Sequence, residues 1–294
     1  MQSLDRDRTT TSRLRPRYAS ANIRTWVGFK QFMYLAEEAV LHWFRERGYG
    51  PGRLYHRYGV GLEIVDSSVL LSAVLKIDDQ VDAQVGWRRP GHFGVRLTVT
   101  RDGKPVPVLR GRVAVALVTE RNAPAQDPAP QCLAPLVVPS VSAVAEPVTP
   151  PPPVEPFTFQ WQARYFHCHY SDRVQHGTYV QALEEVVDRF LANHAISVPR
   201  MLAERGWIPV VSRARVRLLA DAHMDDQIMT TFKVTDIIKN SAFDGRMDSY
   251  IIGPDQLRHV ATAQILHGYA NTDGAGALTE LDPATVAALT GETP

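Results

Sequence analysis

The chain has 294 residues, of which 45% are hydrophobic and 21% are charged, and its formal net charge is +1 at pH 7. This composition is typical of a globular protein long enough for two domains. The near-neutral charge provides no global field that would attract nucleic acid or a membrane surface. Two cysteines cannot build a disulfide framework. We therefore expect a cytoplasmic protein that binds neither nucleic acid nor membrane.

The first half predicts a polar start, one long helix and several strands. Residues 1–16 are arginine-rich without the apolar stretch of a secretory signal, so we expect a flexible basic arm. Apolar side chains recur at helical spacing over residues 29–47, and Gly48 ends this helix. Strands are expected near residues 59–65, 68–77, 80–85, 94–101 and 110–118.

A proline-rich segment separates the two halves. Residues 122–157 hold 11 of the 21 prolines. Proline lacks an N–H and fixes φ, so this segment cannot be helix or central strand. We expect an extended, semi-rigid linker of the polyproline II type.

The second half repeats the plan of the first. A strand is expected over residues 157–170, then a turn, then a helix over 178–195 with Thr178 as its N-cap. Further strands are expected over residues 210–219, 227–237, 242–252 and 257–269.

Short sequence matches at one separation indicate an internal duplication. Arg17-Tyr18, Glu37-Glu38 and Asp78-Asp79-Gln80 recur as Arg164-Tyr165, Glu184-Glu185 and Asp225-Asp226-Gln227. The numbers 17 and 164, 37 and 184, and 78 and 225 each differ by 147. Three matches in the same order at one separation favour two diverged copies of one module.

The element order of each half, a long apolar helix followed by an antiparallel sheet, predicts an α+β fold in which the sheet wraps the helix. The second half resembles the hot-dog thioesterases of the 4-hydroxybenzoyl-CoA thioesterase type. The resembling segments are Tyr170-Ser171-Asp172, His176-Gly177, the helix from Tyr179 to Glu185, the strand pair over 211–226, and Asn240 to Phe243. The first half resembles the same family more weakly. The resemblance implies a tandem, or double, hot-dog.

We therefore expect five segments: a basic arm (1–16), an N-terminal hot-dog repeat with a degenerate site (17–121), a linker (122–157), a C-terminal hot-dog repeat with the active site (158–272), and a tail (273–294). Hot-dog modules characteristically pair, and a homodimer of double hot-dogs is one assembly that the resemblance allows.

By this resemblance, the activity is hydrolysis of an acyl-CoA or acyl-carrier-protein thioester. The acid of the turn, Asp172, is expected to act as base or nucleophile, and His176 to orient substrate or act as base. The amides of Gly177 and Thr178, which open the helix, are expected to hold the carbonyl oxygen. The spacing from Asp172 to Glu184 is about one helical turn shorter than in the family, so a structural turn-capping role for Asp172 stays open.

Other residues are expected to bind substrate: Tyr179, Asn240, Ser241, Trp26, Arg88, Arg89 and Arg213, the arginines as partners for coenzyme A phosphates. No metal site and no cofactor beyond the coenzyme A or phosphopantetheine of the substrate is expected.

The first repeat presents no carboxylate between residues 8 and 37, so it is expected to shape the pocket rather than to catalyse. Arg24, Trp26 and Lys30 would line its altered site. Glu184 and Glu185 are an alternative, because some hot-dog thioesterases use a helical acid, but Glu37-Glu38 recur in the copy without the turn acid, which favours a structural role.

Two other functions stay open on the same scaffold. One is a different enzyme, an acyltransferase/decarboxylase or a dehydratase. The other is a non-catalytic module that binds an acyl group or docks a carrier protein.

Overall fold

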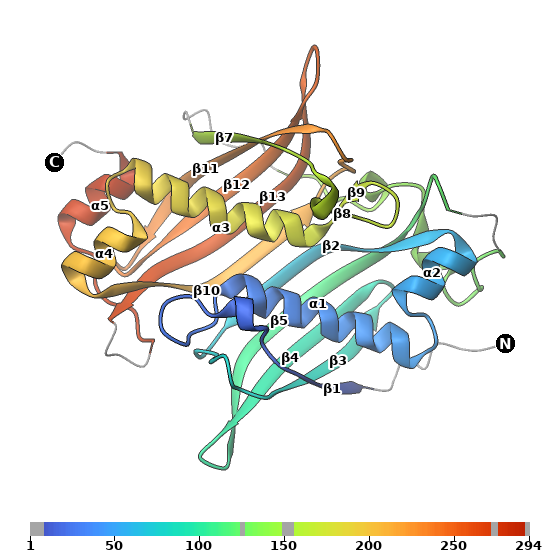
Figure 1. Cartoon of the computed structure of the whole chain (residues 1–294), viewed down its shortest axis with the longest axis horizontal. Helices are drawn as coiled ribbons and strands as arrows, with labels where there is room; N and C mark the ends of the chain where they lie inside the picture. Colours follow the sequence, from blue (N-terminus) through green and yellow to red (C-terminus); the bar gives the residue numbers. More distant parts are fainter. Residues whose placement is uncertain (1–8, 124–126, 149–155, 272–275, 292–294) are drawn as a thin grey trace.

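A computed structural model describes residues 9–123, 127–148, 156–271 and 276–291. Its main feature is an eleven-stranded sheet shared by both halves (Figure 1). The first half contributes β1 (Thr10–Leu14), β3 (Val81–Arg89), β4 (His92–Arg101), β5 (Lys104–Thr119) and β2 (Val60–Leu71), in that spatial order. The second half continues it with β10 (Trp207–Leu218), β13 (Leu257–Asn271), β12 (Ala242–Ile252), β11 (Gln227–Ile238) and β7 (Phe157–Gln162).

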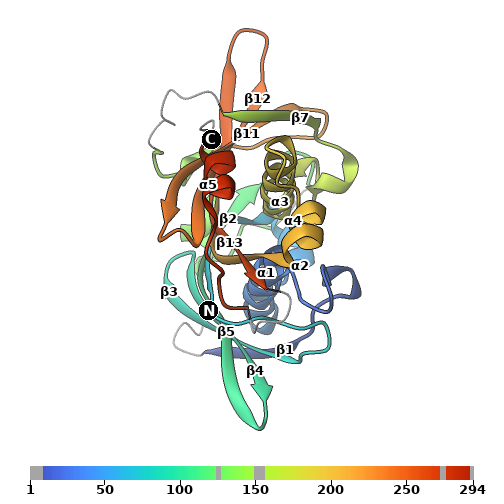
Figure 2. The ribbon, with the colours of Figure 1, turned by 90° about the vertical axis from the view of Figure 1, so that its left-hand side faces the viewer.

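Two long helices lie on one side of this sheet (Figure 2). They are α1 (Phe29–Glu46) and α3 (His176–Asn193), and each buries an apolar stripe against the strands of its own half. In the first half Trp43 of α1 is fully buried and stacks on Trp87 of β3 at 5.4 Å. In the second half Phe190 of α3 packs edge-on against Phe232 of β11 at 5.2 Å. The sequence prediction of a double hot-dog, with a sheet wrapped around each helix, is confirmed.

The duplication extends to details of the backbone. The first residues of α1 and α3, 29 and 176, differ by 147, and so do those of the following short helices α2 (Pro51–Tyr58) and α4 (Val198–Arg205). The 3-10 helices η1 (Tyr18–Ser20) and η4 (Tyr165–His167) have the same separation. Because these elements keep one separation through both halves, they descend from one ancestral module.

The repeated Asp-Asp-Gln motif closes a turn in both halves. Asp79 accepts a hydrogen bond from the Lys76 amide at 2.8 Å, and Asp226 accepts one from the His223 amide at 2.8 Å. The residue numbers 76 and 223 again differ by 147. The shared motif therefore has a structural role, since the carboxylate satisfies a turn amide that the sheet does not pair.

Several expected elements differ from those observed. Residues 59–65 and 68–77 do not form two strands but the single strand β2, whose register shifts between Ile64 and Asp66. The strand expected over residues 157–170 ends at Gln162 and is followed by η4, β8 (Cys168–His169) and β9 (Arg173–Val174). Helix α3 is capped by Gln175 rather than Thr178. Helices α2, α4 and α5 (Pro283–Thr290) were not expected.

The proline-rich segment is not an extended spacer where the structure describes it. Over residues 127–148 it folds into η2 (Ala134–Leu136), β6 (Val137–Val138) and η3 (Val141–Ala143), and β6 pairs in parallel with β5. Leu133 and Val141 are fully buried. The apolar residues between the prolines therefore fasten this segment to the sheet. The four consecutive prolines lie outside the described residues.

The two chain ends differ from the expected arm and tail. The expected arm, residues 1–16, includes β1, which pairs with β3, while residues 1–8 lie outside the described part. The C-terminal tail includes α5, which contacts β11. Across the described residues, no helix combines the length and apolar character needed to cross a membrane.

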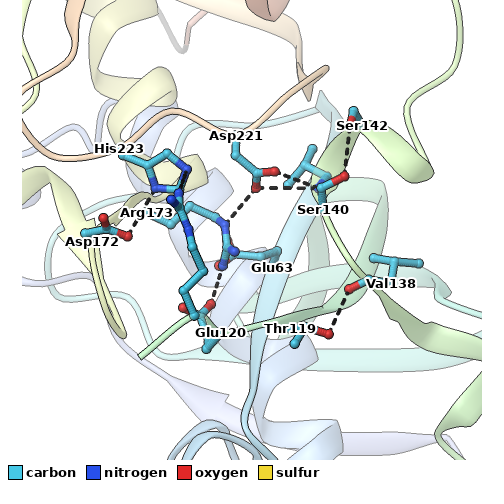
Figure 3. A network of polar contacts seen from close by, with 12 residues as sticks. Glu63, Thr119, Glu120, Val138, Ser140, Ser142, Asp172, Arg173, Asp221 and His223 are labelled. Carbon is cyan, nitrogen blue, oxygen red and sulfur yellow. Dashed lines mark hydrogen bonds and ion pairs between the residues drawn. The ribbon is translucent and has the colours of Figure 1, made fainter. Parts of the chain in front are cut away.

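A buried charge network joins the repeats and the linker (Figure 3). The Arg173 guanidinium donates to Glu63 of β2 at 3.2 Å, to Glu120 and to Asp221 at 2.7 Å. Asp221 in turn accepts from the Val141 amide of the linker at 3.2 Å. Burial alone would raise the pKa of Glu63, but the charges of His169 and Arg173 outweigh burial and lower it. The network therefore holds Glu63 ionised.

We expect Arg173→Leu to lower the free energy of unfolding by roughly 3–5 kcal/mol, because it leaves buried carboxylates without their cation. Arg213→Leu is the matched control: it removes a half-exposed ion pair with Asp244 and should cost less than about 1 kcal/mol. Urea unfolding of both variants measures the difference. Equal losses would show that the Arg173 network does not hold the repeats together.

Candidate active site

A cavity of about 930 Å³ lies between the two repeats. One end is formed by the start of α1, with Trp26, Gly28 and Lys30, and by residues 71–74 at the end of β2. Glu184 of α3 faces this end from the other repeat. The cavity thus needs both repeats, since neither supplies all of its walls.

The segment before α1 is fixed so that the helix start points into this cavity. Trp26 forms a bridge with Lys76, and the Val27 amide donates to the Leu75 carbonyl at 2.9 Å. Gly28 is the N-cap, and no side chain caps the helix. Within the described residues, no hydrogen-bond partner is found for the amides of Phe29 and Lys30. Such amides at a helix start can bind an anion or a developing oxyanion.

A carboxylate from the opposite repeat pairs with the side chain of Lys30 in the same cavity. Lys30 Nζ donates to Glu184 Oε2, and both side chains are about one-third exposed or less, at 26% and 31%. In the part of the chain that the structure describes, Glu184 Oε1 has no hydrogen-bond partner. One oxygen of the carboxylate is therefore held in place by Lys30, and the other is available to a water or a substrate.

The equivalent start of α3 is filled by side chains. The Tyr34 hydroxyl of α1 donates to the Gly177 carbonyl at 3.0 Å, and a methyl group added at Gly177 would touch the Tyr34 ring at 3.3 Å. Burial raises the pKa of Tyr34, so the hydroxyl stays protonated as a donor. The Thr178 amide donates to the Gln175 carbonyl and is not free, contrary to expectation. Neither Gly177 nor Thr178 lines the cavity.

His176 is fixed at this closed helix start. It is 2% exposed, its Nδ1 lies 2.7 Å from Glu37 Oε1, and its Nε2 lies 3.3 Å from the Val216 carbonyl. Burial alone lowers the pKa of His176, but the nearby Glu37 carboxylate outweighs burial and raises it. An imidazolium that donates to both acceptors fits this environment.

Asp172 lies in the turn beside the charge network. Its Oδ1 accepts from His223 at 3.1 Å, and its side chain is 37% exposed (Figure 3). It does not line the cavity. The acid predicted to catalyse is thus placed next to Arg173 and His223, away from the amides of α1.

The residues expected to bind substrate are scattered. Trp26 lines the cavity, as does Lys30, but Arg24 does not. Tyr179 is 1% exposed in the core, and Arg213 pairs with Asp244 on the outer face of β10. Four further residues lie elsewhere on the surface: Arg88 and Arg89 at the end of β3, and Asn240 and Ser241 in the turn before β12.

The sequence analysis placed the acid within a single repeat, at Asp172, and favoured a structural role for Glu184. The first repeat has no acid of its own at its helix start, and Glu184 reaches it from the second. Its counterpart Glu37 reaches the second helix start in the same way. The repeated Glu-Glu pair was therefore the sequence feature that marked Glu37 and Glu184. Their contacts with the opposite helix starts depend on how the two repeats pack.

The described residues show no group of three or more His, Cys, Asp or Glu side chains that could hold a metal ion.

Comparison with known proteins places this geometry in context. Residues 157–289 match a family model described as the thioesterase-like superfamily. Over nearly the whole chain the fold is similar to a 12:0-ACP thioesterase from Umbellularia californica, with TM-score 0.63, 11% identity, and coverage of 89% of this chain and 94% of that one.

Two bacterial structures are similar to a comparable extent. A putative oleoyl thioesterase from Lactobacillus plantarum has TM-score 0.58 and 12% identity, with coverage of 90% and 98%. An acyl-ACP thioesterase from Bacteroides thetaiotaomicron has TM-score 0.53 and 11% identity, with coverage of 88% and 97%. At these identities the likeness concerns the fold. A search of curated protein sequences gave no match.

We expect the His176–Glu37 pair to make stability depend on pH. The folded pKa of His176 is raised, so the contribution of the pair is complete below the unfolded value of about 6.5. It is lost as the pH rises through the higher folded pKa. The unfolding free-energy difference between wild type and Glu37→Gln should therefore shrink from pH 6 to pH 9, as measured by urea titration. A constant difference would contradict the pairing.

Proposed function

We propose that the protein hydrolyses an acyl thioester at the start of α1. Residues 157–289 match a family model described as the thioesterase-like superfamily, and the described chain has the double hot-dog fold. One observation carries this proposal. Glu184 of the second repeat pairs with Lys30 of the first in a cavity large enough for an acyl chain, and the same cavity is lined by a helix start with two amides that have no partner within the described residues.

The helix start supplies the oxyanion site. The thioester carbonyl oxygen accepts from the amides of Phe29 and Lys30, whose dipoles favour negative charge at this position. Asn22 adds a polar group, because its side-chain amide lies against Gly28 so closely that a methyl group there would collide with it. The Lys30 ammonium places a further positive charge beside the developing oxyanion.

Glu184 supplies the base or nucleophile. As a base, its free oxygen takes a proton from water while the hydroxide adds to the carbonyl carbon. The tetrahedral intermediate then collapses, the carbon–sulfur bond breaks, and the thiol leaves with a proton. As a nucleophile, the same oxygen attacks the carbonyl carbon, the carbon–sulfur bond breaks and the thiolate leaves, and water then hydrolyses the resulting anhydride to the free acid and the Glu184 carboxylate. Lys30 holds the carboxylate in place in either case.

Acyl-CoA and acyl-carrier-protein thioesters are both suitable substrates in this account. Two of the three structures of similar fold are named as acyl-ACP thioesterases, so both substrate forms belong in the first assay. Release of free thiol measures hydrolysis. Hydration of an enoyl group or tight binding without turnover would release no thiol and would favour those alternatives. Acyl transfer would release thiol only when an acyl acceptor other than water is supplied.

Glu184→Gln is expected to lower kcat by about 10²–10⁴-fold, because the amide neither accepts a proton nor attacks a carbonyl. Thiol release from acyl-CoA and acyl-ACP under single-turnover conditions measures the effect.

Two matched variants serve as controls. Glu185→Gln alters a neighbouring carboxylate on the same helix that pairs with Arg189 at 2.7 Å, and Asp172→Asn alters the acid that the sequence favoured. Both should keep kcat within a few-fold of wild type. A loss of activity in Asp172→Asn with full activity in Glu184→Gln would move the reaction to the second repeat and overturn the proposal.

A further inference from the structure

The cavity continues from the Lys30–Glu184 pair into the second repeat. Aliphatic side chains line much of it there: Val187 and Leu191 of α3, Val198 of α4, Ile208 of β10 and Ile265 of β13. Asp188 and Ser212 line it as well. Together they form a limb under α3 that suits the apolar part of an acyl chain. Lys30, Glu184 and the helix start lie at the other end, where the thioester is placed by the proposed function.

A buried histidine also lines this limb. His267 lines the cavity, is 4% exposed, and has no hydrogen-bond partner for its Nδ1 among the described residues. A buried nitrogen without a partner costs free energy that a carbon atom in its place would not cost. The ring is held by stacking on Phe243 at 4.8 Å and by an edge contact with Tyr269 at 5.4 Å.

The strand register fixes where this imidazole sits. His267 lies opposite Val211 of β10 on one side and Phe243 of β12 on the other. It is two residues after Ile265, so both side chains point to the helix side of the sheet and into the same limb. Since β10 separates β13 from β2, His267 belongs to the second-repeat part of the cavity and not to the helix start of α1.

The protonation state of the imidazole indicates which chemical groups can form a hydrogen bond with it. Burial lowers the pKa of His267 to about 4, so the ring is neutral near pH 7 and offers one donor and one acceptor. A neutral imidazole between aliphatic walls does not compensate the desolvation of a carboxylate. A hydroxyl or a ketone forms the missing hydrogen bond without bringing a charge into the limb.

We propose that His267 is a specificity residue, and that the preferred acyl chain carries a hydroxyl or keto group at the position that reaches it. This inference rests on the proposed function, because it takes the thioester to lie at the start of α1. It adds the chemical class of the acyl group: an aliphatic chain with one hydrogen-bonding substituent remote from the thioester. A plain alkyl chain fills the same limb but leaves the buried nitrogen unpaired.

The test compares acyl-CoA thioesters of one chain length, either unsubstituted or with a single hydroxyl at each successive carbon. For wild type, we expect one position of the hydroxyl to raise kcat/KM about tenfold or more over the unsubstituted chain. His267→Phe keeps an aromatic ring on Phe243 but removes the hydrogen bond, so this ratio should fall to about one. His267→Gln keeps a donor and an acceptor and should retain part of the preference.

The outcomes separate this inference from the proposed function. If wild type cleaves all chains alike, or if the preference survives in His267→Phe, the inference is overturned while loss of activity in Glu184→Gln still supports hydrolysis. Binding of the matched non-hydrolysable thioethers, measured by calorimetry, gives the same comparison without turnover. If the protein hydrolyses none of the thioesters, binding still tests the inference. Selective binding of the hydroxylated thioether supports the role of His267, and equal binding overturns it.

Discussion

The antiparallel pairing of β2 with β10 is the constraint on which the site depends. These strands pair from Arg213 opposite Leu70 to Arg217 opposite Asp66, and the Arg215 guanidinium holds Asp66 across the seam. The pairing makes one sheet from two modules and lays α1 and α3 side by side (Figure 1). Each helix start then faces the middle of the other helix. A carboxylate at one repeated helical position can therefore serve the opposite repeat.

The two helix starts have diverged from this common plan. At the α3 start, Tyr34 fills the space and His176 pairs with Glu37, so burial and hydrogen bonding replace an open site. At the α1 start, the counterpart of Tyr34 is Gln181, a slimmer side chain that lines the cavity. Lys30 occupies the position that corresponds to Gly177 of the second repeat, and its ammonium group pairs with Glu184. The start of α3 is thus closed by side chains, whereas the start of α1 is open to the cavity. The open helix start lies in the first repeat, which was expected from the sequence to have a degenerate site.

The sequence predicted the fold better than the site, for physical reasons. Helical periodicity and the repeated motifs are local, so they placed α1, α3 and most strands close to their observed bounds. Helices α2 and α4 were missed because they are short and polar. Their signals were a proline near the start and Gly59 or Gly206 in the left-handed conformation at the end. The proposed site was not predicted because Lys30 and Glu184 are 154 residues apart in the sequence and pair only through tertiary packing. The spacing of residues within one repeat carries no information about this contact between the two repeats.

A structure with a bound, non-hydrolysable thioether or amide analogue of an acyl-CoA tests the central claim most directly. The account predicts that the carbonyl oxygen of an amide analogue lies within hydrogen-bonding distance of the Phe29 and Lys30 amides. It also predicts that Glu184 approaches the carbonyl carbon, directly or through one water, while the acyl chain runs under α3. A carbonyl held at the start of α3, beside Asp172 and His176, would contradict it.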